Sequence, residues 1–225
     1  MSTSSSRAPK GTVAIPTAFI LIAVAVWELA VKLMGVSPRI LPAPTQVARA
    51  GWQQREVIAG HAAATLQVTA VGFALSMVCA WVLAIASDFS PTLRKGLQPL
   101  LVASQTVPVI AIAPLIIIWF GFGIVPKMLV VALVTFFPVA IGLIEAFDRT
   151  DRDATRLLRS MGASRWQQFR MVRLPQAMPA FFTALRIGIT YAVTGAIFAE
   201  YVGAKQGLGI YMSVQKNAFR TDLVL

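Results

Sequence analysis

The stretch RDATRLLRSMGASRWQQFRMVRLP, residues 152–175, holds six arginines and lies between two long apolar segments. Asp151 and Asp153 favour the start of a helix, because negative charge stabilises the positive end of the helix dipole. Apolar residues then recur at i, i+3, i+4 and i+7, which predicts one apolar helix face. This face consists of Ala154, Leu157, Leu158 and Met161. Gly162 follows, where a left-handed residue commonly ends a helix.

The second half of the stretch predicts another short helix. Ser164 and Gln167 have the spacing of a capping box, and Trp166 and Phe169 share a face. Pro175 is expected to end this helix, with the residue before it extended. The whole stretch therefore predicts a helix–glycine turn–helix on a membrane surface. Anionic lipid headgroups would explain the arginines, but a protein partner also explains two helices with a defined turn.

The bulk composition indicates a polytopic membrane protein. Of the 225 residues, 57% are hydrophobic and 13% are charged, and the mean hydropathy is +0.72. A soluble enzyme with an unusually large core is the alternative. The net charge of +11 would suggest a nucleic-acid partner in a soluble protein, but loops on the cytoplasmic side of a membrane explain it better. We therefore expect membrane lipid, and no nucleic acid, among the partners.

Uncharged runs predict the membrane-spanning segments. About 20 apolar residues cross a bilayer, and the backbone must be hydrogen-bonded within it, so each span should be a helix. We predict an all-α protein with five spans, at 13–34, 63–87, 99–119, 127–146 and 178–199. Residues 1–12 are expected to be a disordered tail, 13–225 the transmembrane domain, and 148–177 a surface loop. Leu223, Val224 and Leu225 resemble the first turn of a sixth, truncated span.

Charge predicts the orientation. The arginines of 147–177, the basic pair of 88–98 and the two basic residues of the N-terminal tail all fall on one side, which should be cytoplasmic. The opposite side carries 35–62, which is not free of arginine, together with 120–126 and the segment after 200.

The arginine-rich loop resembles the cytoplasmic loop of binding-protein-dependent ABC importer permeases. That motif is Glu-Ala-Ala, three residues, Gly, nine residues, Ile, one residue, Leu-Pro. Its glycine, isoleucine and Leu-Pro positions match this sequence, but its Glu-Ala-Ala positions hold Arg-Leu-Leu. The resemblance implies that the loop contacts an ATPase. The residues it assigns to ATPase coupling are Arg156, Leu157, Leu158, Gly162, Ala163, Ser164, Trp166, Phe169, Val172, Leu174 and Pro175.

The resemblance covers nearly the whole chain from Trp27 onward. LPAPTQV (41–47), APLIIIWFGFG (113–123), FFPV (136–139), AEYVGAKQGLG (199–209) and FRTDLV (219–224) are similar to permeases of the nitrate/taurine/sulfonate type. This group includes carriers of thiamine pyrimidine precursors and riboflavin. The resemblance implies a type I ABC importer transmembrane domain in a bacterial cytoplasmic (inner) membrane, with a cytoplasmic N-terminus. In that family a final helix follows the RTDLV stretch.

The same resemblance implies the partners and the cargo. They are an ATP-binding subunit carrying ATP and Mg, an extracytoplasmic solute-binding protein, and a second permease copy in a homodimer. The sequence of residues 104–115, SQTVPVIAIAPL, resembles the permeases for thiamine pyrimidine precursors and riboflavin more than those for sulfonates, and it favours these two as substrate. A sulfonate, taurine or nitrate is the alternative.

Enzyme motifs are absent from the sequence. It has no phosphate-binding G-x-x-x-x-G-K-[ST] loop, no H-E-x-x-H pair and no cysteine–histidine metal cluster. We therefore expect no catalytic residue, metal or cofactor in this chain, and ATP hydrolysis by a separate subunit. His61, the single histidine, is interpreted as a helix-end residue rather than a proton relay.

Four residues are candidates for the translocation path. Pro108 and Pro114 should bend the third span, or simply kink it for packing. Arg186 lies about 10 Å along the fifth span from Pro179 and either gates the path or extends to the interface. Glu200 faces a cavity, contacts the delivery protein or ends a helix in solvent. A secondary transporter or channel, or a membrane scaffold, remain alternative classes.

Overall fold

The protein is described by a computed structural model that covers residues 11–104, 106 and 108–225, and only the backbone at 11–14, 109 and 110. All regular structure within these residues is helical, which confirms the predicted all-α class. The chain forms two compact units. Unit 1 comprises the residues up to Ile58 together with Met212–Leu225, and unit 2 is Ala59–Tyr211.

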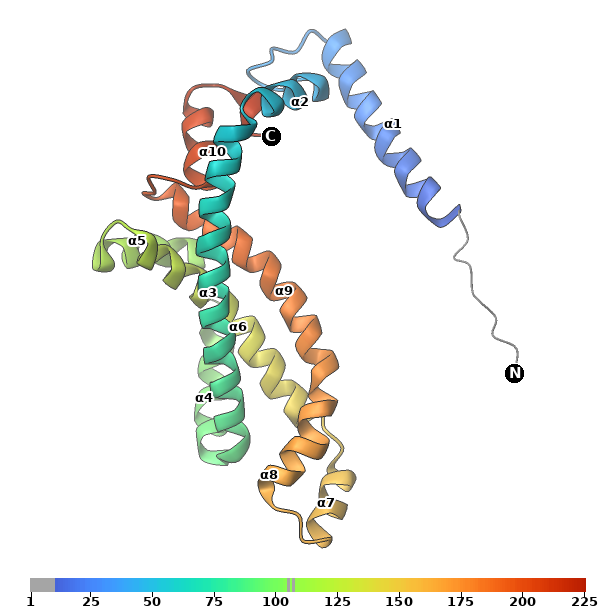
Figure 1. Ribbon diagram of the computed structural model, residues 1–225, viewed down its shortest axis with the longest axis vertical. Helices are drawn as coiled ribbons and strands as arrows, with labels where there is room; N and C mark the ends of the chain where they lie inside the picture. Colours follow the sequence, from blue (N-terminus) through green and yellow to red (C-terminus); the bar gives the residue numbers. More distant parts are fainter. Residues whose placement is uncertain (1–10, 105, 107) are drawn as a thin grey trace. The chain divides into compact units, whose positions relative to one another are not determined.

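Unit 2 contains most of the helices (Figure 1). They are α3 (Arg55–Phe89), α4 (Pro91–Ser104), α5 (Val109–Phe120), α6 (Ile124–Asp148), α7 (Arg152–Ser160), α8 (Arg165–Gln168), a π-helical turn (Phe169–Arg173), α9 (Leu174–Tyr201) and α10 (Leu208–Asn217). Residues 55–58 of α3 and residues 212–217, the larger part of α10, belong to unit 1. This unit also holds α1 (Gly11–Leu33), α2 (Pro44–Gln53) and a 3₁₀ turn (Thr221–Leu223).

Small residues at every fourth position allow the helices of unit 2 to pack closely. Helix α3 buries Gly72, Ser76, Ala80 and Ala84, and α9 buries Ala184, Gly188, Ala192 and Ala196. Close packing over such stripes is how helices associate within lipid, where no hydrophobic effect drives them together. A Cβ at Gly72 would lie 2.7 Å from the Met128 carbonyl oxygen, so α3 and α6 approach with no room for a side chain.

Four helices within the described residues are long and apolar enough to cross a membrane. They are Ile15–Leu33, Arg55–Phe89, Ile124–Asp148 and Arg165–Tyr201, and they contain the predicted spans at 63–87, 127–146 and 178–199 and most of the first. Large apolar side chains such as Leu66, Val82 and Phe182 are exposed on their outer faces. Those faces suit contact with lipid tails.

The predicted single helix over 99–119 was wrong. Helix α4 ends at Ser104, and α5 begins only after Pro108. Pro108 has ψ 114°, an extended conformation, and it lacks the amide hydrogen that a continuing helix would need. Pro114, in contrast, lies inside α5 without ending it. The remaining apolar helix here, Ala111–Phe120, is too short to cross a bilayer alone.

Unit 1 joins segments that are far apart in the sequence. Glu28 in α1 pairs with Lys32 at 2.7 Å and accepts hydrogen bonds from the backbone amide and hydroxyl of Thr45 at the start of α2. Of the predicted tail, residues 1–10 lie outside the described residues, and residues 11 and 12 already belong to α1.

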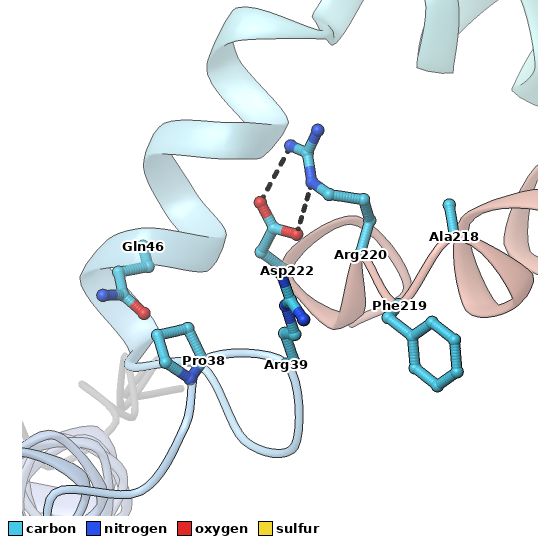
Figure 2. A pocket seen from close by; sticks show the side chains of 7 residues that line it. All are labelled: Pro38, Arg39, Gln46, Ala218, Phe219, Arg220 and Asp222. Carbon is cyan, nitrogen blue, oxygen red and sulfur yellow. Dashed lines mark hydrogen bonds and ion pairs between the residues drawn. The ribbon is translucent and has the colours of Figure 1, made fainter.

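The 38–46 segment and the end of the chain surround a cavity of about 560 Å³ (Figure 2). Arg220 donates two hydrogen bonds of 3.0 Å to Asp222, and this lowers the pKa of Asp222 below its ordinary value. The Thr221 hydroxyl donates to the carbonyl of Arg39. The family-like segments LPAPTQV and FRTDLV therefore belong to one local structure.

Candidate functional site: the 151–175 loop

The first helix of the loop is capped at both ends as the sequence predicts. The Asp151 carboxylate accepts hydrogen bonds from the amides of Asp153, at 2.8 Å, and Ala154, at 3.2 Å. At the other end, Gly162 has φ +82°, and the amide of the next residue, Ala163, donates to the carbonyl of Leu158. This bond pattern is the Schellman motif, which needs a left-handed residue at the glycine position.

The second helix begins with the predicted capping box. The Ser164 hydroxyl accepts from the amide of Gln167 at 3.2 Å, and the Gln167 side chain accepts from the amide of Ser164 at 2.7 Å. The expected end at Pro175 was wrong. After α8 the chain passes through a π turn and enters α9 at Leu174, where the proline occupies the first helical turn. A proline in that first turn costs no α-helical hydrogen bond, and the helical conformation continues from Arg165 to Tyr201.

Aromatic side chains fasten the loop to the bundle. Trp166 stacks on Phe169, with ring centroids 5.6 Å apart, as the shared face predicted. Phe89, the last residue of α3, lies 6.3 Å from Trp166 and 5.6 Å from Phe169. Phe147 near the end of α6 completes the cluster, 5.4 Å from Phe169. Phe169 is buried, so these contacts should make the second helix of the loop move with α3 and α6.

Ion pairs reinforce the same attachment. Arg173 in the π turn donates a hydrogen bond to Asp88 of α3, whose side chain is only 4% exposed. Arg94 of α4 pairs with Asp148, the last residue of α6. Arg165 donates to the carbonyl of Phe89 at 3.3 Å. The loop is thus attached to the end of α3 through Arg173 and Arg165, while Arg94 joins α4 to the end of α6.

The sequence pattern did not identify this attachment point, Asp88 and Phe89, which we call the base of the loop. Asp88 and Phe89 directly follow the uncharged run that ends at Ser87, which marks them as a span end. Nothing in the local pattern pairs them with Arg173 and Arg165, which are 85 and 76 residues away. Figure 1 shows the result, with α7 and α8 placed where α6 ends and α9 begins.

An apolar surface remains uncovered on the loop. Leu157 is 63% exposed, Met161 is 75% exposed and Trp166 is 56% exposed. Ala154 and Leu158, predicted on the same stripe, are half-buried. Arg156 is exposed and pairs with Asp153 at 3.3 Å, while Ala163, Val172 and Leu174 are half-buried and Pro175 is exposed. We call Leu157, Met161 and Trp166 the loop face.

The path candidates are distributed over different environments. Pro108 is exposed, Pro114 is half-buried, and Arg186 is exposed on α9. None of the ion pairs found among the described residues involves Arg186. Also within these residues, no group of three or more His, Cys, Asp and Glu side chains is placed to hold a metal ion.

Glu200 has an environment that the sequence interpretation did not foresee. Its side chain is fully buried, at 0% exposed, so the interpretation as a solvated helix end was wrong. It accepts hydrogen bonds from the Thr65 hydroxyl and from the Gly209 amide, each at 2.9 Å. One signal for this burial existed in the sequence, because Glu200 continues the four-residue stripe of small residues in α9.

The chain belongs to the family of binding-protein-dependent transport system inner membrane components, whose family model matches residues 72–225. That range includes the whole 151–175 loop and the core of unit 2. The protein is therefore the permease component of a binding-protein-dependent ABC importer and a multi-pass inner membrane protein. This membership sets aside the secondary-transporter and scaffold alternatives.

Relatives with named transport functions carry different solutes. The chain is 37% identical to the formylaminopyrimidine transport permease ThiX of Halalkalibacterium halodurans, over 87% of this chain and 78% of the relative. It is also 37% identical to the riboflavin transport system permease RibX of Chloroflexus aurantiacus, over 93% and 79%. Identity to the taurine transport system permease TauC of Escherichia coli is 33%, over 95% and 80%.

Proposed function

We propose that the 151–175 loop is the coupling element through which a separate ATPase subunit drives solute import. The observation that carries this proposal is the combination of an exposed apolar loop face with a rigid base. The face offers Leu157, Met161 and Trp166 to a partner. The base, made by Asp88 and Phe89, would pass a displacement of the loop directly to α3.

The proposal includes the orientation and the partners. The loop and the N-terminus lie on the cytoplasmic side, because arginine-rich loops are retained there. ATP and Mg bind the ATPase subunit, and a second copy of this chain completes the pathway, along which Pro108, Pro114 and Arg186 lie. The arginines of the loop also contact anionic lipid headgroups. An external binding protein delivers the solute.

The proposed cargo is a thiamine pyrimidine precursor or riboflavin. The two 37% relatives, ThiX and RibX, support this choice over taurine or another sulfonate. In a binding-protein-dependent system the delivery protein selects the cargo. Calorimetric titration of that partner with formylaminopyrimidine, riboflavin and taurine tests the choice, and binding of taurine alone would overturn it.

Met161→Glu tests the coupling role. A charge placed in an apolar contact should reduce recovery of the ATPase subunit by about 10-fold or more, as expected for a central interface residue. Met34→Glu is the matched control, since Met34 is 77% exposed but lies in the segment after α1. Both variants should insert into the membrane. Full recovery of the ATPase with Met161→Glu, or solute movement by the permease alone without nucleotide, would contradict the proposal.

A further inference from the structure

Three successive backbone amides at the start of α10 are held by side chains from other helices. The amide of Gly207 donates to Nδ1 of His61 at 3.1 Å, and the amide of Leu208 donates to the Thr65 hydroxyl at 2.8 Å. The amide of Gly209 donates to Glu200 at 2.9 Å. The first amides of a helix have no partner inside it, so α3 and α9 together provide the acceptors for α10.

Glu200 and Thr65 form the centre of this arrangement. The Thr65 hydroxyl accepts from Leu208 and lies 2.9 Å from both carboxylate oxygens of Glu200. The carboxyl group thus connects α9, α3 and the first turn of α10. We call Glu200, Thr65 and His61 with the amides of 207–209 the clamp.

The two glycines of the clamp leave no room for side chains. Gly207 has φ +133°, which L residues rarely adopt, and a Cβ there would lie 2.1 Å from the carboxyl carbon of Glu200. A Cβ at Gly209 would lie 2.3 Å from the carbonyl oxygen of Ile197. The Gly-Leu-Gly spacing after Glu200 is therefore what allows the carboxylate to reach the backbone.

The clamp closes a short loop that forms one wall of a cavity. Residues 203–206 face Gln67 of α3, Phe122 of the α5–α6 turn and Lys127 of α6 across about 460 Å³. This volume lies within the range of small-molecule sites. The polar side chains that line it, Gln67, Lys127, Lys205 and Gln206, can all donate hydrogen bonds. A small solute that presents acceptor oxygens would match them.

The cavity lies at the end of unit 2 opposite the coupling loop. Thr65 belongs to the clamp and Asp88 to the base of the loop, and both are on α3. Their separation of 23 residues corresponds to about 35 Å of helix, roughly the thickness of a bilayer. If the coupling loop is cytoplasmic, as the proposed function states, then the clamp and its cavity are on the side where solute is delivered.

We propose that this outer cavity is where the delivered solute first meets the permease, and that Glu200 is a positioning residue that holds its 203–206 wall. Glu200 does not touch the solute. It acts through Thr65 and the amides of Gly207–Gly209. This inference rests on the proposed import function and assigns a different part of the chain to solute entry.

The test uses the complete complex, with ATPase subunits and loaded binding protein, in proteoliposomes. Glu200→Ala should reduce solute uptake and binding-protein-stimulated ATP hydrolysis by about 10-fold or more, because two acceptors for buried donors are lost. Basal ATP hydrolysis and recovery of the ATPase subunit should stay within about 2-fold of the unmodified complex, since the coupling loop is untouched. Equal loss of basal and stimulated activity would indicate general damage and overturn the proposal.

Conservative variants separate position from charge. Glu200→Gln keeps an acceptor for the Gly209 amide and offers its NH₂ group to the Thr65 hydroxyl, so it should restore most of the uptake. Thr65→Ser should behave like the unmodified protein, and the isosteric Thr65→Val should behave like Glu200→Ala. If Glu200→Ala does not fold, the two Thr65 variants decide whether the hydrogen bonds of the clamp are needed for solute uptake. A Glu200→Gln protein as impaired as Glu200→Ala would overturn the positioning role.

The rate of thiol labelling directly reports how firmly the 203–206 wall is held. In a Cys79→Ala background, Lys205→Cys should react with a water-soluble maleimide at least about 5-fold faster when Glu200 is alanine, because the wall is no longer held. An unchanged rate would contradict the inference even if uptake fell. If the unmodified permease recovers no ATPase subunit, the proposed function fails, and this labelling result still decides whether the clamp holds the wall.

Discussion

Replacing Gly162 with alanine isolates the contribution of one backbone conformation to the coupling loop. Gly162 has φ +82°, and no described atom lies within 4 Å of the position that a Cβ would take. The substitution therefore introduces no clash. What remains is the cost of placing an L residue in the left-handed region, about 1–2 kcal/mol.

This cost should appear as weaker protection of the loop's backbone amides against hydrogen exchange. A free-energy change of about 1–2 kcal/mol corresponds to about a 5- to 30-fold change in an equilibrium constant. The amides of Gly162 and Ala163, which donate to the carbonyls of Arg159 and Leu158, should exchange with solvent faster by that factor. Affinity for the ATPase subunit should fall in the same direction, and by no more than that factor.

The assay is hydrogen–deuterium exchange of the purified permease, followed by titration with the ATPase subunit. Gly162→Asn is the matched control, because asparagine tolerates the left-handed conformation better than alanine, and its amide exchange should lie closer to that of the unmodified protein. Membrane insertion should be unchanged in both variants. Unaltered exchange with Gly162→Ala, or equal effects of alanine and asparagine, would refute the assignment of the turn.

Three further outcomes follow from packing and charge. Gly72→Ala should lower the free energy of unfolding by about 1–3 kcal/mol, because its Cβ would overlap α6. Gly60→Ala has open space around its Cβ and should raise the free energy of unfolding by up to about 1 kcal/mol. Denaturant titration of both variants measures this difference. Asp88→Ala leaves its arginine partner uncompensated and should destabilise the protein by up to about 3–5 kcal/mol in the same titration. Arg220 lowers the pKa of Asp222 from its ordinary 3.8. Their ion pair should therefore add about 0.2–1 kcal/mol to the free energy of unfolding above pH 3.8, and this stabilisation should be lost as the pH falls through the lowered pKa. Asp222→Asn should remove this pH dependence of stability in a series of unfolding curves.

Most of the coupling loop was predictable from sequence because its determinants are local. Asp151 and Ser164 each accept from amides two or three residues away, and Gly162 ends the first helix through bonds within six residues. Such caps are set by residue type and spacing alone. Pro175 misled the interpretation because a proline is common both just after the end of a helix and in the first turn of the next one, and the local sequence does not distinguish the two positions.

The break in the predicted third span has a different origin. The run from Gly96 to Pro126 is uncharged, and for that reason we predicted one span at 99–119 within it. The helix instead ends at Ser104, and Pro108, in an extended conformation, is the N-cap residue of the next helix. A proline inside a membrane helix is often tolerated, because neighbouring helices satisfy the freed carbonyls. Sequence patterns therefore do not decide between a kink and a break.

The sequence by itself determined the all-helical class, the long membrane spans and the capped helix–turn–helix of the loop, since hydropathy, capping and turn formation act over a few neighbouring residues. Only the tertiary structure decided which distant groups meet. Arg173 reaches Asp88 across 85 positions, and Thr65 reaches Glu200 across 135. Such pairings depend on how α3, α6 and α9 pack through their small residues, and that packing is a property of three surfaces together rather than of any one segment.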